Sequence, residues 1–194
     1  VGVFYGCTGL TGPTQFPEHF TSVPPAYYSH CTRLGQLNIT ENITSIGYEA
    51  FCNCTSLGPA CNIPTTVKYI GNRAFYNCAS LIVHMNYHPD LKLGEFVFAQ
   101  CTGLPSVEFT EGLTEIPTGT FFNCTNMRGP LVFPKTITRI GDYAFYNCSR
   151  LSGDLDLYSI LGVIGNYAFY NCRGLNGNLV LGPASRPIQH VNLC

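Results

Sequence analysis

Hydrophobic and polar positions recur along the chain with a spacing of 23 or 24 residues. Each unit has a cysteine, an aromatic residue three positions before it, a leucine or methionine three positions after it, and usually an aliphatic residue eight positions before it. The clearest copies are residues 140–151 and 164–175. Four columns that stay in phase along the whole chain predict a repeat architecture. The cysteine column is Cys7, Cys31, Cys54, Cys78, Cys101, Cys124, Cys148 and Cys172.

Each repeat has two parts. A short alternating stretch after the cysteine, such as 131–133 or 155–157, predicts a half-buried strand. A Gly-x-x-Ala-Phe stretch before the next cysteine predicts one or two helical turns with the Phe inward. A strand of about three residues cannot bury its apolar side alone, so the copies must stack, with parallel strands about 4.8 Å apart. We therefore predict one α/β repeat solenoid over residues 1–194, with about eight coils, one strand per coil and helical turns on the convex side.

The repeat word L-x-x-L-x-L-P-x-x-L-x-x-I-G-x-x-A-F-x-x-C resembles the BspA-like leucine-rich repeats. Residues 124–175 show it best, and the resemblance extends over essentially the whole chain. It implies a curved, right-handed leucine-rich-repeat superhelix and a role in adhesion or protein binding at a cell surface. It implies no catalytic residue, because the motif is structural. The copy after Cys78 lacks the Ile-Gly and the Ala, and the copy ending at Cys31 has Val23-Pro24-Pro25 instead of Ile-Gly.

The cysteine column has two interpretations. Free cysteine is among the most buried residue types, so the column suits a stack of small hydrophobic side chains. Disulfides between neighbouring coils have an acceptable Cα separation, but equivalent side chains point the same way, which is poor geometry for a bridge. No C-x-x-C pair suggests zinc, and Cys61 is expected in the core. Cys52 and Cys194 are the candidates for exposed thiols, through which an intermolecular bridge could form.

Five Asn-x-Ser/Thr sequons are candidates for glycosylation. Asn38 and Asn42 lie near an expected strand edge and turn, where a glycan has room. The other three belong to the repeated word Asn-Cys-Ser/Thr, in which the Asn could instead hydrogen-bond the corner of the coil. Those three are Asn53, Asn123 and Asn147.

The outward strand positions predict a mildly polar, amide-rich face along the solenoid. Repeat proteins commonly bind partners on such extended faces. This concave sheet face suits a protein or carbohydrate ligand better than nucleic acid. Its candidate partner-binding residues are Asn38, Asn62, His84, Asn86, Glu108, Asp154 and Asp156.

Metal and enzyme chemistry find little support. His84 and His88 are four residues apart on a strand, about 13 Å, too far to share an ion. Asp154, Asp156 and Asn178 could frame calcium, but they lack a binding loop. No motif pairs a nucleophile with a histidine, so we expect no enzyme and no cofactor. Aromatic residues of the helical turns serve either packing or a lateral, sugar-binding patch: Tyr76, Phe122, Tyr143, Tyr146, Tyr167 and Tyr170.

Composition narrows the function classes further. Charged residues make up 11 % of the 194 positions and the net charge is −1, which argues against nucleic-acid binding and a polybasic membrane anchor. No apolar run approaches the ~18 residues of a membrane span. Without an initiator methionine, the chain is expected to be an excised or processed part of a longer protein, with 183–194 a degenerate half-repeat.

Two hypotheses for the function follow. The first is an extracellular or cell-surface module that binds proteins or mediates adhesion. The second is a structural subunit of an extracellular filament, assembled head to tail through uncapped solenoid ends. Such a heterologous contact propagates into a fibre when it does not close.

Overall fold

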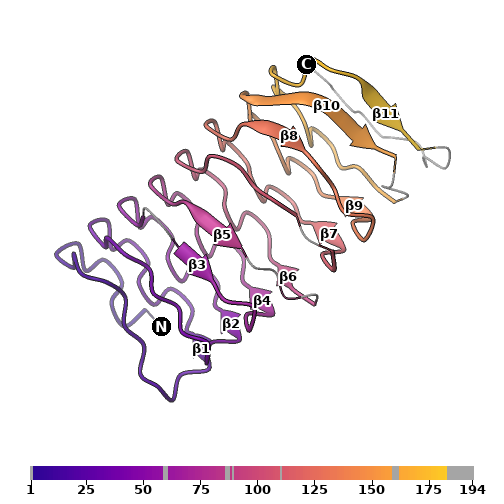
Figure 1. The fold of residues 1–194 in the computed structure, drawn as a ribbon. Coiled ribbons are helices and arrows are strands. Elements are labelled where there is room, and N and C mark those ends of the chain that lie inside the picture. The colour runs from indigo at the N-terminus through magenta and orange to yellow at the C-terminus, as the bar shows by residue number, and fades with distance from the viewer. Residues whose placement is uncertain are drawn as a thin grey trace.

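The chain winds into a stack of short parallel strands and turns (Figure 1). The computed structural model describes residues 2–58, 61–85, 88, 90–109, 111–158 and 162–182, without the side chains of His84 and Met85. Residues 59–60, 86–87 and 183–194 are among those outside this description, so the calls on Asn86, Cys194 and the terminal half-repeat are not tested. The parallel solenoid has about six turns, and the predicted eight coils are not confirmed.

Two strand positions occur in each well-formed coil, where the sequence predicted one. The first follows the cysteine and carries the predicted alternation: β3 (Cys61–Ile63), β5 (Val83–Met85), β8 (Gly129–Leu131), β10 (Leu151–Leu157) and β11 (Leu179–Leu181). The second contains the recurring aliphatic residue: β1 (Ser22–Val23), β2 (Ser45–Ile46), β4 (Tyr69–Ile70), β6 (Lys92–Leu93), β7 (Glu115–Ile116) and β9 (Arg139–Ile140). Strands of two residues are too short to show alternation, which is why the sequence did not reveal them.

All strand pairs are parallel and join equivalent positions of neighbouring coils. The aliphatic strands form the sheet β1-β2-β4-β6 and the pair β7-β9. The strands after the cysteines form β3-β5 and the sheet β11-β10-β8. Parallel pairing satisfies the backbone of each short strand only through its neighbours, so no coil is expected to be stable alone.

The predicted helical turns are not confirmed, since the described residues contain no helix. In residues 49–54, the backbone N–H groups donate alternately to a carbonyl of the same coil and to a carbonyl of the next coil. Ala50 N–H donates to the Gly47 carbonyl at 3.3 Å, and Phe51 N–H donates to the Ala74 carbonyl at 2.8 Å. Glu49 and Asn53 adopt positive φ, 51° and 59°. A left-handed residue interrupts the i→i−4 pattern of an α-helix, so the segment forms linked turns that bond to the adjacent coil.

Stacked aromatic rings fill the interior, as predicted. Phe145 and Cys148 are fully buried, and Cys61 is also in the core. The rings of Phe121 and Phe145 lie 5.4 Å apart at an interplanar angle of 17°, and those of Phe145 and Phe169 lie 5.4 Å apart at 4°. The same nearly parallel stacking runs from Tyr28 through Phe51, Phe75, Phe98, Phe121 and Phe145 to Phe169.

The cysteine column forms a second ladder beside the rings. Its members from Cys31 to Cys172 are buried free thiols, so for them the packing interpretation is confirmed and the disulfide interpretation is wrong, whereas Cys7 is a free but exposed thiol. Each thiol of this column from Cys31 to Cys172 also donates to a carbonyl of the preceding coil: the Sγ–H of Cys148 donates to the Phe121 carbonyl at 3.1 Å, and that of Cys124 to the Phe98 carbonyl at 3.1 Å. Cysteine suits this position because it is small, apolar and a weak donor.

Candidate functional site

A sheet face is exposed where β8, β10 and β11 lie side by side (Figure 1). Leu155 of β10 pairs with Leu131 of β8, and Asp156 pairs with Val180 of β11. Because outward positions of parallel neighbours align, Asp156 lies between Val132 and Val180 on the surface. The Val132 side chain is 72 % exposed, which is unusual for a large apolar residue. The sheet face of these three strands therefore combines apolar and acidic side chains.

A shallow groove of about 330 Å³ lies on this sheet face. Its lining consists of Pro130, Leu131, Val132, Phe133, Asp154 and Asp156. Oδ1 of Asp154 accepts the Asn178 N–H at 2.7 Å, and Oδ1 of Asp156 accepts the Tyr158 N–H at 2.9 Å. These bonds fix both carboxylates, and no Lys, Arg or His among the described residues forms an ion pair with either one. The groove thus offers negative charge above an apolar floor.

The structure brings together only part of the predicted partner-binding set. Asp154 and Asp156 share the groove on β10. Asn38, Asn62 and Glu108 are exposed, but none of them lines this groove. The sheet is interrupted between β5 and β8, where 105–109 form no strand, so the described strands do not make one continuous sheet. The side chain of His84, and all of Asn86, lie outside the described residues.

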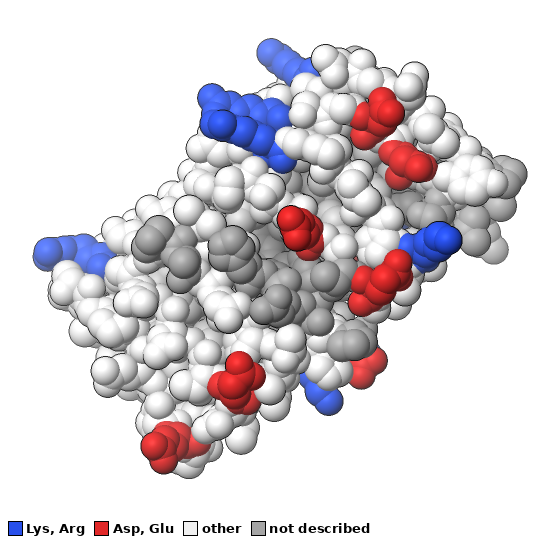
Figure 2. Space-filling view, in the orientation of Figure 1, with Lys and Arg blue, Asp and Glu red and all other residues white. Residues whose placement is uncertain are grey.

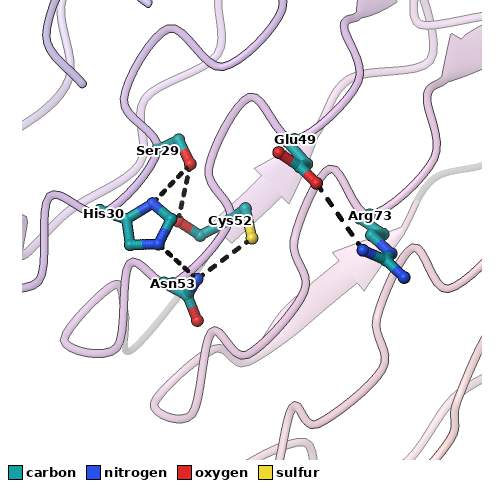
Figure 3. Close-up of polar contacts among 6 residues, drawn as sticks. All are labelled: Ser29, His30, Glu49, Cys52, Asn53 and Arg73. Atoms are coloured by element: carbon teal, nitrogen blue, oxygen red, sulfur yellow. Dashed lines mark hydrogen bonds and ion pairs between the residues drawn. The ribbon is translucent and has the colours of Figure 1, made fainter. Parts of the chain in front are cut away.

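A cysteine, a histidine and an amide meet near the start of the solenoid (Figure 3). Asn53 Nδ2 lies 3.0 Å from His30 Nε2 and donates to Cys52 Sγ at 3.4 Å. His30 Nδ1 lies 3.0 Å from Ser29 Oγ. The two imidazole nitrogens contact the amide and the hydroxyl, and the thiol contacts the amide, so the cluster lacks the thiolate–imidazole contact that nucleophilic cysteines use.

Cys52 is not the exposed thiol that the sequence predicted. Its side chain is only 5 % exposed, because the linked turns pack it where a helix would have turned it outward. Burial, and then the charge of Glu49, raise the pKa of the Cys52 thiol to about 11, although Arg73 opposes this. Cys7 is the exposed thiol of the described residues.

The buried thiols of the core are held in the protonated form. Burial raises the pKa of Cys101 and of Cys61 to about 12. It raises the pKa of Cys78, Cys124 and Cys148 well above the ordinary thiol value. Since the thiolate is the nucleophile and the metal ligand, these sulfur atoms serve packing.

An asparagine ladder occupies the position before the cysteines, and the sequence reasoning missed its extent. Asn147 Nδ2 donates to Asn123 Oδ1 at 3.0 Å, and Asn171 Nδ2 donates to Asn147 Oδ1. Asn77 Nδ2 donates to Asn53 Oδ1 at 2.8 Å. All five adopt positive φ, between 56° and 59°, a conformation that Asn tolerates better than most residues. The recurring Asn-Cys pair was the signal that could have revealed the ladder.

The ladder separates the sequons into two groups. Asn53, Asn123 and Asn147 are half-buried ladder members, whereas Asn38 and Asn42 are exposed. Asn42 Nδ2 donates to the Glu18 carbonyl at 2.7 Å, an exposed contact. Glycosylation stays a prediction, and the geometry favours Asn38 and Asn42 as the carriers.

Metal-binding clusters and membrane-spanning helices are both absent from the residues that the structure describes. No group of three or more His, Cys, Asp or Glu side chains gathers where it could hold a metal ion. In the same part of the chain, no helix is long and apolar enough to cross a membrane.

A solenoid of short parallel strands, repeating every 23 or 24 residues around a leucine and cysteine interior, defines the leucine-rich repeat class. The family model of the BspA type leucine rich repeat region matches six copies, over residues 2–128 and 89–180. The chain therefore belongs to the BspA-type leucine-rich repeat family, as the sequence predicted.

Solved structures show the same fold. A leucine-rich repeat protein of T. pallidum is 22 % identical, with a TM-score of 0.71 over 86 % of this chain and 78 % of that one. A leucine-rich cell surface protein of Faecalibacterium prausnitzii is 24 % identical, with a TM-score of 0.58 over 95 % of this chain. The chain spans 62 % of the length of that second protein. No curated protein matches the chain.

Proposed function

We propose that the chain is an extracellular or cell-surface module that binds proteins through its sheet face. The observation that carries this proposal is the groove on β8 and β10, where two fixed carboxylates border exposed apolar side chains. A monomeric surface rarely leaves such a combination of exposed apolar groups unused. Membership of the family supports a binding module, and the similarity to a leucine-rich cell surface protein of F. prausnitzii supports the location at the cell surface.

The chemistry of the groove favours a protein partner over a carbohydrate. Its floor is apolar and its polar groups are two carboxylates, so a segment with apolar and basic side chains complements it. We therefore expect the partner to be held by side-chain burial at the centre and charge pairing at the rim.

A library of random peptides displayed on phage tests the proposal. Peptides selected on the immobilised wild-type chain are expected to be rich in Lys, Arg and apolar residues. Their affinity should fall by about tenfold or more for Asp156→Lys and for Val132→Asp, because each change removes a contact at the centre of the groove. Fluorescence anisotropy with the selected peptides measures the affinities.

Glu18→Lys is the matched control, since Glu18 is exposed and does not line the groove. Selected peptides should bind this variant as they bind the wild type. Equal binding to all three variants would contradict the sheet face as the binding surface.

A filament subunit is a second candidate, because apolar cavities lie in the first and the last described coils. One of about 250 Å³ is lined in part by Phe4, Leu10 and Tyr28. The other, of about 270 Å³, is lined in part by Phe169 and Leu175. Head-to-tail stacking of copies would cover both sets of side chains.

Light scattering and electron microscopy of the purified chain test this candidate. If the filament is the function, concentrated protein should form particles far larger than 21.3 kDa, and Leu175→Asp should prevent them by placing a charge in the end contact. Val163→Asp, at an exposed position outside both cavities, should leave assembly intact. A monodisperse wild-type chain would contradict the filament.

A further inference from the structure

Charges are segregated across the width of the solenoid. The five residues after each cysteine of the ladder contain four arginines, Arg33, Arg128, Arg150 and Arg173, and none of the 11 acidic residues of the chain. Elsewhere on the molecule, Lys and Arg are mixed with Asp and Glu. The segments concerned are 8–12, 32–36, 55–59, 79–83, 102–106, 125–129, 149–153 and 173–177.

These segments form one edge of the solenoid, which we call the post-cysteine edge. Backbone bonds join them coil to coil: Ser56 N–H donates to the Thr32 carbonyl at 3.2 Å, and Arg128 N–H donates to the Pro105 carbonyl at 2.8 Å. Figure 2 shows Lys and Arg side chains gathered at the upper-left edge, with the acidic side chains on the face and toward the opposite edge. With coils about 4.8 Å apart, Arg128, Arg150 and Arg173 lie on three successive coils that span about 10 Å.

The guanidinium groups of this edge contact neutral partners. Arg150 Nη1 donates to Asn126 Oδ1 at 2.8 Å, and Arg173 Nε donates to Asn171 Oδ1 at 2.6 Å. These bonds orient the guanidinium groups without neutralising them. The ion pairs of Arg73 with Glu49 and of Arg139 with Glu115 involve other parts of the described chain. The edge therefore carries uncompensated positive charge in a chain whose net charge is −1.

The other side chains of the post-cysteine edge indicate which class of polyanion this edge binds. The eight segments contain no Phe, Tyr or Trp, so the edge lacks the stacking surfaces that single-stranded nucleic acids use. Leu104, Met127 and Leu151 of these segments are buried in the core, so these side chains are not available to insert into a membrane. Exposed or half-buried Ser, Thr and Asn side chains surround the arginines instead, for example Thr125, Asn126 and Ser152. Hydroxyl and amide groups of this kind suit the hydroxyls of a sugar chain.

We propose that the post-cysteine edge binds a sulfated polysaccharide that runs along the solenoid axis across Arg128, Arg150 and Arg173. The planar guanidinium fork matches the oxygens of a sulfate group and binds them with two parallel hydrogen bonds. Neighbouring Ser, Thr and Asn side chains bond the sugar hydroxyls between the sulfates. The arginines of this edge do not line the groove of the sheet face, so the module would bind a glycan through its edge and a protein through its groove.

Fluorescently labelled heparin oligosaccharides provide the probe, with unsulfated dextran as the neutral comparison. The wild-type chain is expected to bind heparin at low ionic strength and to release it as the salt concentration is raised. It is expected not to bind dextran. The triple variant Arg128→Gln/Arg150→Gln/Arg173→Gln should bind at least about tenfold more weakly, since each exposed charge pair contributes roughly a factor of two to five. The triple Arg→Lys variant should recover part of the lost affinity, because it keeps the charge and loses the fork.

Arg139→Gln is the matched control, because it removes an exposed arginine elsewhere that is already paired with Glu115. It should bind heparin as the wild type does. Circular dichroism should show the same fold for every variant, as all four arginines are exposed. Unchanged binding by the triple variant would overturn the proposal, as would equal or tighter binding of single-stranded DNA or of anionic phosphatidylserine vesicles. Peptide binding to the sheet face should be unaffected by the triple variant, so the two surfaces are tested separately.

Discussion

Between pH 9 and pH 11 the protein is expected to lose its fold, because buried thiols must stay protonated in it. Burial raises the pKa of Cys61 and Cys101 to about 12 and raises that of Cys54, Cys78, Cys124 and Cys148 as well. In the unfolded chain these thiols ionise near their ordinary value of 9.0. A raised pKa contributes stability that is fully present below pH 9 and is lost as the pH rises through the folded pKa.

The size of this effect follows from the number of thiols. Each contributes a slope of about 1.4 kcal/mol per pH unit above pH 9, so six together give about 8 kcal/mol per unit. A domain has only about 5 to 15 kcal/mol of total stability, so one to two pH units suffice to unfold it. Urea unfolding at pH 7, 8, 9 and 10, with a reducing agent present, measures the slope.

A double variant, Cys101→Ala/Cys124→Ala, provides the control. It should be less stable than the wild type at pH 7 because it leaves cavities, yet its stability should fall about one third less steeply above pH 9. A free energy of unfolding that stays constant from pH 7 to pH 10 would contradict burial of the thiols, because it would mean that their pKa values are not raised in the folded state.

Phe121→Ala is expected to lower the free energy of unfolding by about 3 to 5 kcal/mol. The Phe121 ring is 1 % exposed and stacks between Phe98, at 5.8 Å, and Phe145, at 5.4 Å. Its removal opens a cavity in two interfaces between coils at once. Since repeats contact only their neighbours, the transition should also broaden as the two halves become less strongly coupled. Urea unfolding followed by circular dichroism measures both effects.

The adjacent Phe122 supplies the comparison within the same coil. Its ring is half-buried on the turn side and stacks on Tyr146 at 4.9 Å, so Phe122→Ala should cost only about 1 kcal/mol. If the two variants proved equally stable, the ring column would not be the element that joins the coils.

The sequence predicted what depends on periodicity. The columns of Phe145 and Cys148 pointed inward because a recurring apolar residue needs a shared interior, and both side chains are buried. The alternation around Leu155 and Leu157 predicted the strand β10. Column position also placed Asp156 on the surface, where the groove lies.

Other features depended on hydrogen bonds between coils, which a linear pattern does not show. The stretch before each cysteine has the Ala and Phe of a helix, but its N–H groups bond the neighbouring coil, and Asn147 adopts positive φ. Cys52 was expected to be exposed because it aligned with tyrosines of the turns, yet the linked turns bury a side chain that is small enough to fit. The asparagine ladder likewise exists only when the coils are stacked.

The alternating bonds of the turns give the solenoid a direction. In the linked turns, the N–H groups that bond another coil donate to the C-terminal neighbour. Phe121 N–H donates to the Ala144 carbonyl at 2.8 Å, and Phe145 N–H donates to the Ala168 carbonyl at 2.8 Å. An inverted coil would set donor against donor, so additional units can be accepted in one orientation only. The regular units offer the next coil the same backbone polar groups at the same places. Gene duplication of a 24-residue unit could therefore lengthen the protein without redesign of the units already present.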